Sequence, residues 1–339
     1  MSNKQILKWA SVAGVGLLAA TAVRRARLMR IVPRELRSAL LMVPLTFSPS
    51  LVAILRRVTA VAPASKMPAG MRMTEHWSTG DQDRPPVRIV VLERAARSVN
   101  RPVMLWMHGG GYVIGTPEQD IALLTKLLAR LDIVIVSVDY RLAPEHPFPA
   151  PLDDCHTALE WLTEHASELA IDTARVAVGG QSAGGGLAAA LVQRAVDAGP
   201  VSPVFQLLVY PMLDNATTAV ADHGDTGLFG WTPESNYFGW TSYLGGDPTT
   251  KDHAVYSVPA SRIDLCALPP AWIGVGTLDL FHDEDAAYGE RLRQAGVSCT
   301  THITEGGYHG FDILKPNTVA TERFHDSMVA ALKAGLAIE

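Results

Sequence analysis

The sequence predicts an α/β protein with a mostly parallel sheet and helices on both of its faces. Three observations support this fold class. From residue 87 onward, short apolar runs alternate with segments of helical periodicity. The apolar runs at 103–107 and 133–140 are continuous, which is typical of strands buried on both faces. The chain of 339 residues is also long enough to bury a sizeable core.

The expected elements follow one another in regular alternation. The expected strands are 87–93, 103–107, 133–140, 175–180, 205–211, 271–276 and 298–303. The expected helices are 118–131, 152–169, 183–199, 283–296 and 321–336. Strands that alternate with helices of this length indicate a mostly parallel sheet that is covered on both faces.

Two regions interrupt this alternation. Residues 1–70 are apolar and helix-like, without strand patterns, and residues 212–260 are rich in Gly, Pro, Thr and aromatic residues. Ligands in parallel sheets bind at the carboxyl ends of the strands, so both regions are expected to fold over that edge. The predicted organisation is an N-terminal helical cap segment, a core of 71–211 and 261–339, and a cap insertion at 212–260.

The charge is unevenly distributed along the chain. The formal net charge is -5, but residues 1–60 carry ten Lys and Arg and one acid, Glu35. The remaining residues therefore carry 19 basic and 33 acidic side chains. Nucleic-acid binding needs a basic face on the folded body, and this body is acidic, so a nucleic-acid partner is not expected.

The basic N-terminal region contains an apolar run at 6–23, followed by the arginine-rich residues 24–30. About 18 apolar residues could barely span a bilayer. A secretory signal fits less well, because the arginines follow the apolar run instead of preceding it. The favoured interpretation of residues 6–30 is a helix packed on the body or lying on an anionic membrane surface.

The three cysteines, Cys155, Cys266 and Cys299, are scattered along the chain without paired spacing. This pattern predicts neither a disulfide framework nor a zinc site, and no other metal site is expected. A reducing compartment is the default for such a chain. We therefore expect a cytoplasmic protein, which the N-terminal run could associate with a membrane.

The strongest local signal is Gly180-Gln181-Ser182-Ala183-Gly184, which fits the pattern G-x-S-x-G. It lies between an expected strand and an expected helix, which is the context the pattern requires. In such a turn the serine Oγ points away from the sheet and lies at the N-terminus of the following helix, where the helix dipole stabilises negative charge. A purely structural tight turn is the alternative, and the strand–turn–helix context argues against it.

A serine nucleophile needs a base, and the base needs a carboxylate that orients it. His309 follows the last expected strand, and Asp279 is the first acid after the strand at 271–276. Asp283 is the alternative carboxylate, although acids at a helix start are usually capping residues. The chain order Ser182, Asp279, His309 is the order of α/β-hydrolases, and neither chymotrypsin nor subtilisin shares it.

The segment His108-Gly109-Gly110-Gly111 follows a buried strand. Alone, three glycines indicate an ordinary turn. Beside a nucleophilic serine, they leave backbone N–H groups bare for an oxyanion, together with the N–H of Ala183. We therefore predict an oxyanion hole at this loop.

Together these motifs resemble the hormone-sensitive-lipase group of α/β-hydrolases, which includes many bacterial esterases and the arylacetamide deacetylases. The motifs are HGGG at 108–111, DYRLAPEHPFPA at 139–150, GQSAGG at 180–185, YP at 210–211, LDLFHDE at 278–284 and HGF at 309–311. The resemblance covers roughly residues 70 to 335. It implies an α/β-hydrolase fold with an eight-stranded sheet, a helical cap and ester hydrolysis without a cofactor.

The resemblance also implies residue roles. Ser182 would be the nucleophile, Asp279 the acid and His309 the base. The oxyanion would be bound by Gly110, Gly111 and Ala183, with Gly109 shaping the turn. Leu280 departs from the family pattern, which has proline there, and the N-terminus is longer than usual. A hormone receptor of the family lacks the catalytic histidine, and His309 argues against that kind of relative.

The substrate is less well specified by the sequence. Four aromatic residues of the insertion are expected to line an acyl or alcohol pocket, although ordinary cap packing explains each equally well: Trp231, Tyr237, Phe238 and Trp240. Short- to medium-chain esters are a family-level expectation. The open alternatives are amide, carbamate or lactone hydrolysis on the same triad, a catalytically dead ligand-binding protein, and a membrane docking platform. A homodimer is also open.

Overall fold

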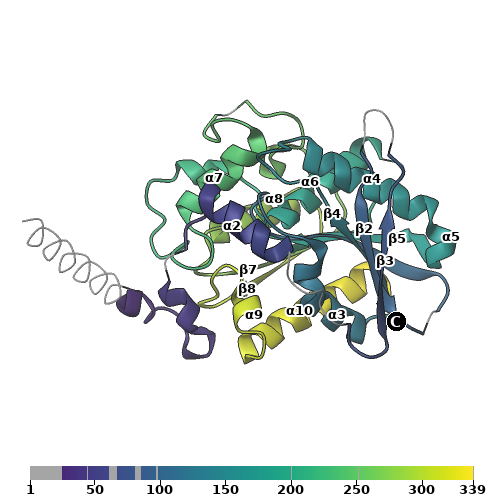
Figure 1. Ribbon diagram of the computed structural model, residues 1–339, viewed down its shortest axis with the longest axis horizontal. Helices are drawn as coiled ribbons and strands as arrows, with labels where there is room; N and C mark the ends of the chain where they lie inside the picture. The colour runs from purple at the N-terminus through teal and green to yellow at the C-terminus, as the bar shows by residue number, and fades with distance from the viewer. Residues whose placement is uncertain are drawn as a thin grey trace, which may run out of the picture.

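The computed structural model describes residues 25–43, 45–60, 67–80, 85–96, 98–199, 201–250 and 252–338. Within these ranges eight strands form one sheet, in the order β1-β2-β4-β3-β5-β6-β7-β8 (Figure 1). The strands are β1 (Met71–Trp77), β2 (Arg88–Arg94), β3 (Arg101–Met107), β4 (Val134–Asp139), β5 (Ile171–Gln181), β6 (Phe205–Val209), β7 (Ala271–Gly276) and β8 (Cys299–Thr304).

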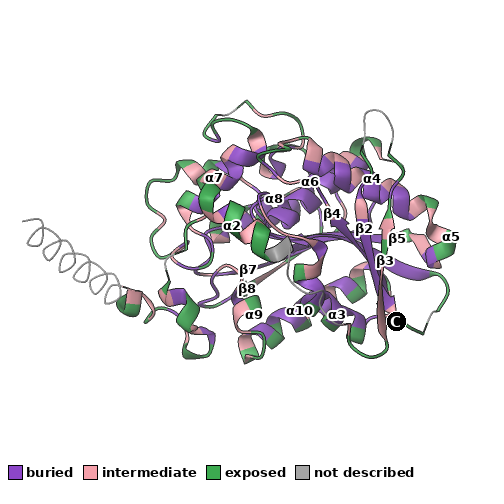
Figure 2. Cartoon of the chain, viewed as in Figure 1, coloured by how far each residue is buried: buried purple, intermediate pink, exposed green. Residues whose placement is uncertain are grey.

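The sheet is mostly parallel, as the sequence predicts. Strand β2 runs antiparallel to both β1 and β4, and every other neighbouring pair is parallel. All residues of β3, β6 and β7 are buried, so the centre of the sheet is covered on both faces (Figure 2). The parallel strands therefore end at one common edge, where the loops that follow them meet.

Helices cover both faces of the sheet (Figure 1). They are α3 (Ile121–Arg130), α4 (Ala150–Glu164), α5 (Ala166–Leu169), α6 (Ala183–Ala198), α8 (His282–Gln294), α9 (Phe311–Leu314) and α10 (Val319–Gly335). Apolar residues of α4, α6 and α8 share one core cluster with the sheet. Those of α3 and α10 form a second cluster against the opposite face.

Strand β1 is the strand of this sheet that the residue patterns do not predict. Its sequence MRMTEHW is mixed, and none of its residues is fully buried. Among the described residues it pairs with β2 alone, at the edge of the sheet, so one side of it has no neighbouring strand there. Such a strand lacks both the apolar run of a central strand and a clear alternation, which are the signals that identify strands in a sequence.

The segments predicted to form the cap contain no strand within their described parts up to residue 70 and from 212 to 260. The N-terminal part has two short 3-10 helices, η1 (Arg34–Leu36) and η2 (Ala39–Met42), and the α-helix α2 (Pro49–Ala60). The segment 212–260 has the 3-10 helices η4 (Asn215–Ala219) and η5 (Pro259–Ser261) and the α-helix α7 (Pro233–Leu244). The two parts touch, because Phe47 N–H donates to Ser235 Oγ at 3.0 Å and the Phe47 ring lies 5.1 Å from Trp231. Figure 1 shows α2 and α7 on the same side of the molecule.

The apolar run at 6–23 lies outside the described residues. Within the described ranges, no helix combines the length and apolar character that a membrane span requires.

Candidate active site

Ser182 occupies a tight turn between β5 and α6. Its backbone has φ 55° and ψ -124°, a strained conformation for a residue other than glycine. A Cβ on Gly180 would lie 2.3 Å from the Gly184 carbonyl oxygen, and one on Gly184 would lie 2.2 Å from that of Met107. The small residues of G-x-S-x-G are therefore required by backbone contacts, and they fix where the serine hydroxyl points.

The structure brings Ser182, His309 and Asp279 together. Ser182 Oγ lies 2.9 Å from His309 Nε2, and His309 Nδ1 lies 2.9 Å from Asp279 Oδ2 and 3.1 Å from Oδ1. Because a carboxylate only accepts, Nδ1–H donates to Asp279, and this leaves Nε2 free to accept from the serine hydroxyl. Asp279 is fully buried and Ser182 is nearly so.

The alternative carboxylate, Asp283, is not part of this arrangement. Its side chain is 95% exposed and contacts the neighbouring His282. It stands in the first turn of α8, where an acid favours the positive end of the helix. The geometry thus separates the two candidates, and only Asp279 reaches the histidine.

The loop that carries Asp279 is closed by hydrogen bonds without the proline common in the family. Asp279 Oδ1 accepts the N–H of Phe281 at 3.0 Å, and Asp279 N–H donates to the Gly276 carbonyl at 3.1 Å. Leu280, the departing residue, is buried. These bonds hold the carboxylate in place, and the ring of Phe281 packs against that of His309 edge to face at 5.2 Å.

The glycine loop after β3 lies beside the serine. Gly110 and Gly111 have φ of 125° and 61°, and a Cβ on Gly111 would lie 2.2 Å from the Trp231 ring. The N–H groups of Val113 and Ile114 both donate to the Gly110 carbonyl, which closes the turn. Among the described residues, the hydrogen bonds leave the N–H groups of Gly110, Gly111 and Ala183 unused.

His108 anchors the same loop. Its ring is fully buried and stacks on that of Tyr140 at 4.2 Å, while Nδ1–H donates to the Gly109 carbonyl at 2.8 Å. Burial lowers the pKa of His108 to about 4, so its ring is neutral at physiological pH. Tyr140 Oη donates to the His108 carbonyl at 2.7 Å. His108 is thus a packing residue, and the histidine whose ring reaches Ser182 is His309.

A cavity of about 180 Å³ opens at the serine. It is lined by Phe47, Gly109, Gly110, Gly111, Gln119, Gln181, Ser182, Tyr210, Gly230, Trp231, His309, Gly310 and Ile313. The sequence patterns predict no place in the cavity for Phe47, Tyr210 or Ile313. Only Tyr210 carried a signal, since it directly follows a strand at the carboxyl edge of the sheet.

Of the four aromatic residues predicted to line a pocket, Trp231 does so. The other three do not line this cavity. Tyr237 is 45% exposed, and Phe238 packs in a small cluster with Val52 and Val113. Trp240 is fully buried against the ring of Tyr112, at 5.7 Å. These three aromatic side chains therefore hold the insertion together or face solvent.

Among the described residues, no group of three or more His, Cys, Asp or Glu side chains is placed to hold a metal ion. The polar groups at the cavity include the Ser182 hydroxyl, the His309 imidazole and the bare N–H groups of the glycine loop, beside the side chains of Gln119, Gln181 and Tyr210. This set can deprotonate a nucleophile and stabilise an oxyanion.

Residues 104–313 match the family described as alpha/beta hydrolase fold. The chain belongs to this family, in its hormone-sensitive-lipase-like branch. The match spans β3 to α9 and so includes the glycine loop, the serine turn, Asp279 and His309. The expected fold class is thereby confirmed on sequence and structure together.

Several relatives are described by name. The chain is 36% identical over 228 residues to Esterase LipI of Mycobacterium tuberculosis. The aligned region covers 66% of this chain and 70% of that protein. It is 37% identical over 216 residues to Carboxylesterase NlhH of the same species, covering 62% and 67%. Among solved structures, Bacterial Heroin Esterase superposes with a TM-score of 0.81 at 34% identity, covering 91% of this chain and 99% of that one.

Proposed function

We propose that this chain is a serine carboxylesterase that cleaves short- to medium-chain carboxylic esters through an acyl-enzyme on Ser182. The observation that carries the proposal is the hydrogen-bonded series from Ser182 Oγ through His309 to the buried Asp279. The family and the relatives named as esterases and carboxylesterases support a carboxylic ester hydrolase.

The first half-reaction forms the acyl-enzyme. His309 Nε2 takes the proton of the Ser182 hydroxyl while Oγ attacks the ester carbonyl carbon. The carbonyl oxygen becomes negatively charged and accepts hydrogen bonds from the bare N–H groups of Gly110, Gly111 and Ala183. Asp279 stabilises the imidazolium. The tetrahedral intermediate then expels the alcohol, whose oxygen receives the proton from Nε2.

The second half-reaction repeats these steps with water. His309 Nε2 removes a proton from a water molecule, and the resulting hydroxide attacks the acyl carbon. The same N–H groups stabilise the second oxyanion. Ser182 Oγ leaves with the proton returned by His309, which releases the carboxylic acid and restores the starting state.

The cavity supports the preference for short to medium acyl chains. Its volume of about 180 Å³ is small, and its apolar walls come from Phe47, Trp231 and Ile313. Apolar side chains favour an aliphatic group, and the small volume favours a short one. A hydrolysis profile over p-nitrophenyl esters of increasing acyl length should peak at a short or medium chain and fall beyond it.

The chemical alternatives on the same triad are amides, carbamates and lactones. The names of the relatives favour esters over these. Parallel assays with p-nitrophenyl esters and the matching anilides separate the two activities, and we expect ester turnover to dominate. A ligand-binding relative without activity would leave Ser182 unlabelled by a fluorophosphonate, because labelling requires an activated serine.

The decisive test is Ser182→Ala, which we expect to lower kcat by about 10⁶-fold, since the three residues act as one unit. Ser137→Ala is the matched control: Ser137 is fully buried in β4, and its Oγ has no hydrogen-bond partner among the described residues. A loss below tenfold in a folded Ser182→Ala protein would exclude Ser182 as the nucleophile.

Two further contacts are proposed from the sequence. Residues 6–30 are proposed to touch an anionic lipid surface, because their apolar run is followed by arginines. Co-sedimentation of the full chain should be stronger with vesicles containing phosphatidylserine than with neutral vesicles, and equal binding would argue against it. Pairing of two copies into a homodimer is tested by light scattering.

A further inference from the structure

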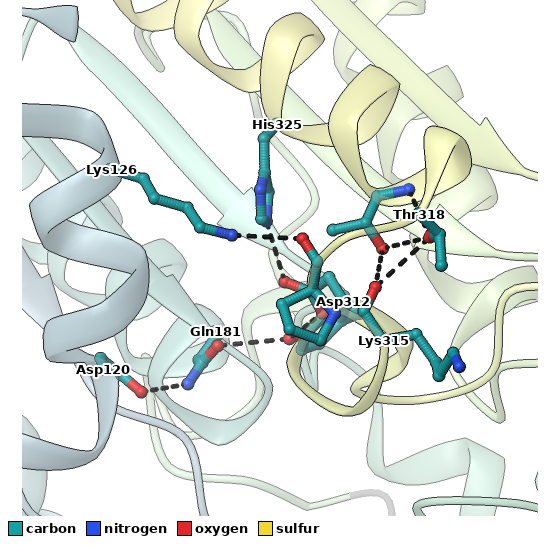
Figure 3. A network of polar contacts seen from close by, with 10 residues as sticks. Asp120, Lys126, Gln181, Asp312, Lys315, Thr318 and His325 are labelled. Carbon is teal, nitrogen blue, oxygen red and sulfur yellow. Dashed lines mark hydrogen bonds and ion pairs between the residues drawn. The ribbon is translucent and has the colours of Figure 1, made fainter. Parts of the chain in front are cut away.

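A buried polar connection begins behind the glycine loop. Asp120, at the end of η3 (Pro117–Asp120), is 4% exposed and accepts two hydrogen bonds from side chains. Trp106 Nε1–H donates to its Oδ2 at 2.7 Å, and Gln181 Nε2–H donates to its Oδ1. Figure 3 shows the second bond. One carboxylate thus joins the end of β3 to the residue that directly precedes Ser182.

The connection continues from Gln181 to the far side of the serine turn. Tyr210 Oη lies 3.2 Å from Gln181 Oε1 and 3.0 Å from Asp312 Oδ1, so its one proton can be donated to either oxygen. Asp312 Oδ2 accepts from His325 Nε2 at 3.3 Å (Figure 3). The side chains of Gln181, Tyr210 and Asp312 are each at most 4% exposed.

Three residues of this hydrogen-bonded series, Asp120, Tyr210 and Asp312, lie next to groups of the candidate site. Gln119, the neighbour of Asp120, donates to the Gly109 carbonyl at 3.1 Å and so supports the glycine loop. Asp312 follows His309 by three residues, and the Tyr210 ring packs edge to face on the His309 ring at 4.8 Å. One series of buried polar contacts therefore connects the glycine loop, the serine turn and the histidine loop.

We propose that Asp120 is a positioning residue for acyl transfer, which holds the oxyanion loop, the nucleophile and the base in a fixed relation through Gln181 and Tyr210. The inference rests on the proposed esterase function. Asp120 does not line the cavity, so it acts through its neighbours and not on the substrate. Misplacement of a reacting group by about 1 Å can lower a rate by about 10²-fold.

The chemistry of Asp120 explains why a carboxylate suits this position. An ionised carboxylate accepts from the indole and from the amide at the same time, and an apolar side chain would leave both buried donors unpaired. Protonated Asp120 could donate to Gln181 Oε1 only if the amide reversed. Burial, together with the charge of Asp312, raises the pKa of Asp120 to about 7, so this change falls within the working pH range. Burial raises the pKa of the Tyr140 and Tyr210 phenols well above the ordinary value, and the charge of Asp120 adds to this rise.

The test compares Asp120→Leu with Asp120→Asn in the full chain. Asp120→Leu breaks both bonds and should lower kcat for a p-nitrophenyl ester by about tenfold to a hundredfold, with KM within threefold. Asp120→Asn should restore most of kcat. The oxygen of the introduced amide can accept from Trp106, and its N–H can donate to Gln181 Oε1 once the Gln181 amide reverses. The pH profile of Asp120→Asn should lack an ionisation near pH 7 that the parent shows.

Gln193→Met is the control for a general loss of buried hydrogen bonds. Gln193 is 1% exposed on α6, and its Nε2 donates to the Pro259 carbonyl and to Tyr288 Oη, away from the site. We expect it to lower the melting temperature without lowering kcat. The proposal is overturned if Asp120→Leu keeps kcat within twofold, or if Gln193→Met loses kcat to the same extent.

A second variant covers the case in which Asp120→Leu does not fold. Tyr210→Phe keeps the ring against His309 and removes only the hydroxyl that links Gln181 to Asp312. It should lower kcat severalfold, and an unchanged kcat would overturn the proposal. A parent protein without ester hydrolysis and without fluorophosphonate labelling of Ser182 would instead refute the proposed function, so the two failures are distinguishable.

Discussion

The carboxyl edge of the sheet and the segment 212–260, predicted to be a cap insertion, differ in what determines the positions of their residues. At the sheet edge, close contacts with the backbone determine which residue types fit, since Gly180 and Gly184 have no room for a Cβ. In the segment 212–260, tertiary packing determines where each aromatic side chain lies. Trp231 reaches the cavity, whereas Trp240 is buried against Tyr112 and Tyr243. Glycines mark the first region and aromatic residues mark the second. Only in the first region does the local backbone conformation determine which residue can occupy each position.

The difference shows how far a local pattern can determine a site. A strained turn such as that of Ser182 excludes most alternatives within a few residues of chain. Trp231 instead packs against Phe47, which lies far away in the sequence, in the N-terminal region. Substitutions that act on the backbone-determined edge should therefore have large effects on activity, and those in the insertion should have smaller and more selective ones.

The largest effect in this comparison is expected from the two competing carboxylates. Asp279→Asn should lower kcat by about 10⁴-fold, because an amide at this position favours the wrong histidine tautomer. Asp283→Asn should change kcat by less than twofold, since that side chain is exposed and contacts only His282 among the described residues. Steady-state kinetics of the two purified variants measure both values. Equal losses would show that the geometric separation of the two acids has no catalytic meaning.

The glycine loop offers the next test. Gly111→Ala should lower kcat by about 10²- to 10³-fold, as does the loss of an oxyanion donor. The residue has φ 61°, and a Cβ would collide with Trp231. Gly224→Ala is matched in backbone conformation, with φ 59°, and has no atom within 4 Å of a new Cβ. It should retain its kcat, so similar losses in both variants would attribute the effect to backbone strain alone.

The strand ends of the sheet were the most predictable part of the molecule. Continuous apolar runs identified the central strands, and Ser182, Asp279 and His309 each follow one of the strands, at an edge where parallel strands must bring their loops together. Strand β1 was missed because it lies at an edge and is only half-buried. Strand β5 begins at Ile171, earlier than predicted, because the residues that follow Ile171, at 172–175, are mostly polar and partly exposed.

The residues missed at the site share a physical reason. Phe47 and Ile313 reach the cavity from segments whose placement depends on packing between distant parts of the chain. The Asp120–Gln181 hydrogen bond is equally impossible to predict from the sequence. The buried acid and the amide are 61 residues apart, so no local sequence pattern links them. Such contacts appear only once the fold has placed the two side chains.

In the insertion, Trp231→Ala tests whether its aromatic residues act on the substrate. Removing the Trp231 ring enlarges the cavity, so kcat/KM for longer acyl chains should rise relative to short ones by about tenfold. Tyr237→Ala should leave the chain-length profile unchanged, because this side chain is exposed and does not line the cavity. A profile altered by Tyr237→Ala and not by Trp231→Ala would reverse the assignment drawn from the structure.

The smallest effect concerns stability and not catalysis. Asp285 on α8 is fully buried, and neither carboxyl oxygen has a hydrogen-bond partner among the described residues. Burial raises the pKa of Asp285 well above its ordinary value, and the charges of Glu284 and Asp279 add to this. Burial likewise raises the pKa of Glu284 to about 8.

Because both acids bind protons more tightly in the folded protein than in the unfolded chain, stability should fall as the pH rises from 5 toward 8. Asp285→Asn removes one of these protonation changes. Its melting temperature relative to the parent should therefore be higher at pH 8 than at pH 5, by a few degrees. The exposed neighbour, in Asp283→Asn, should show the same small difference at both pH values. If Asp285→Asn instead lost stability on going from pH 5 to pH 8 as steeply as the parent, Asp285 would not be the group that titrates, and Glu284 would carry the dependence alone.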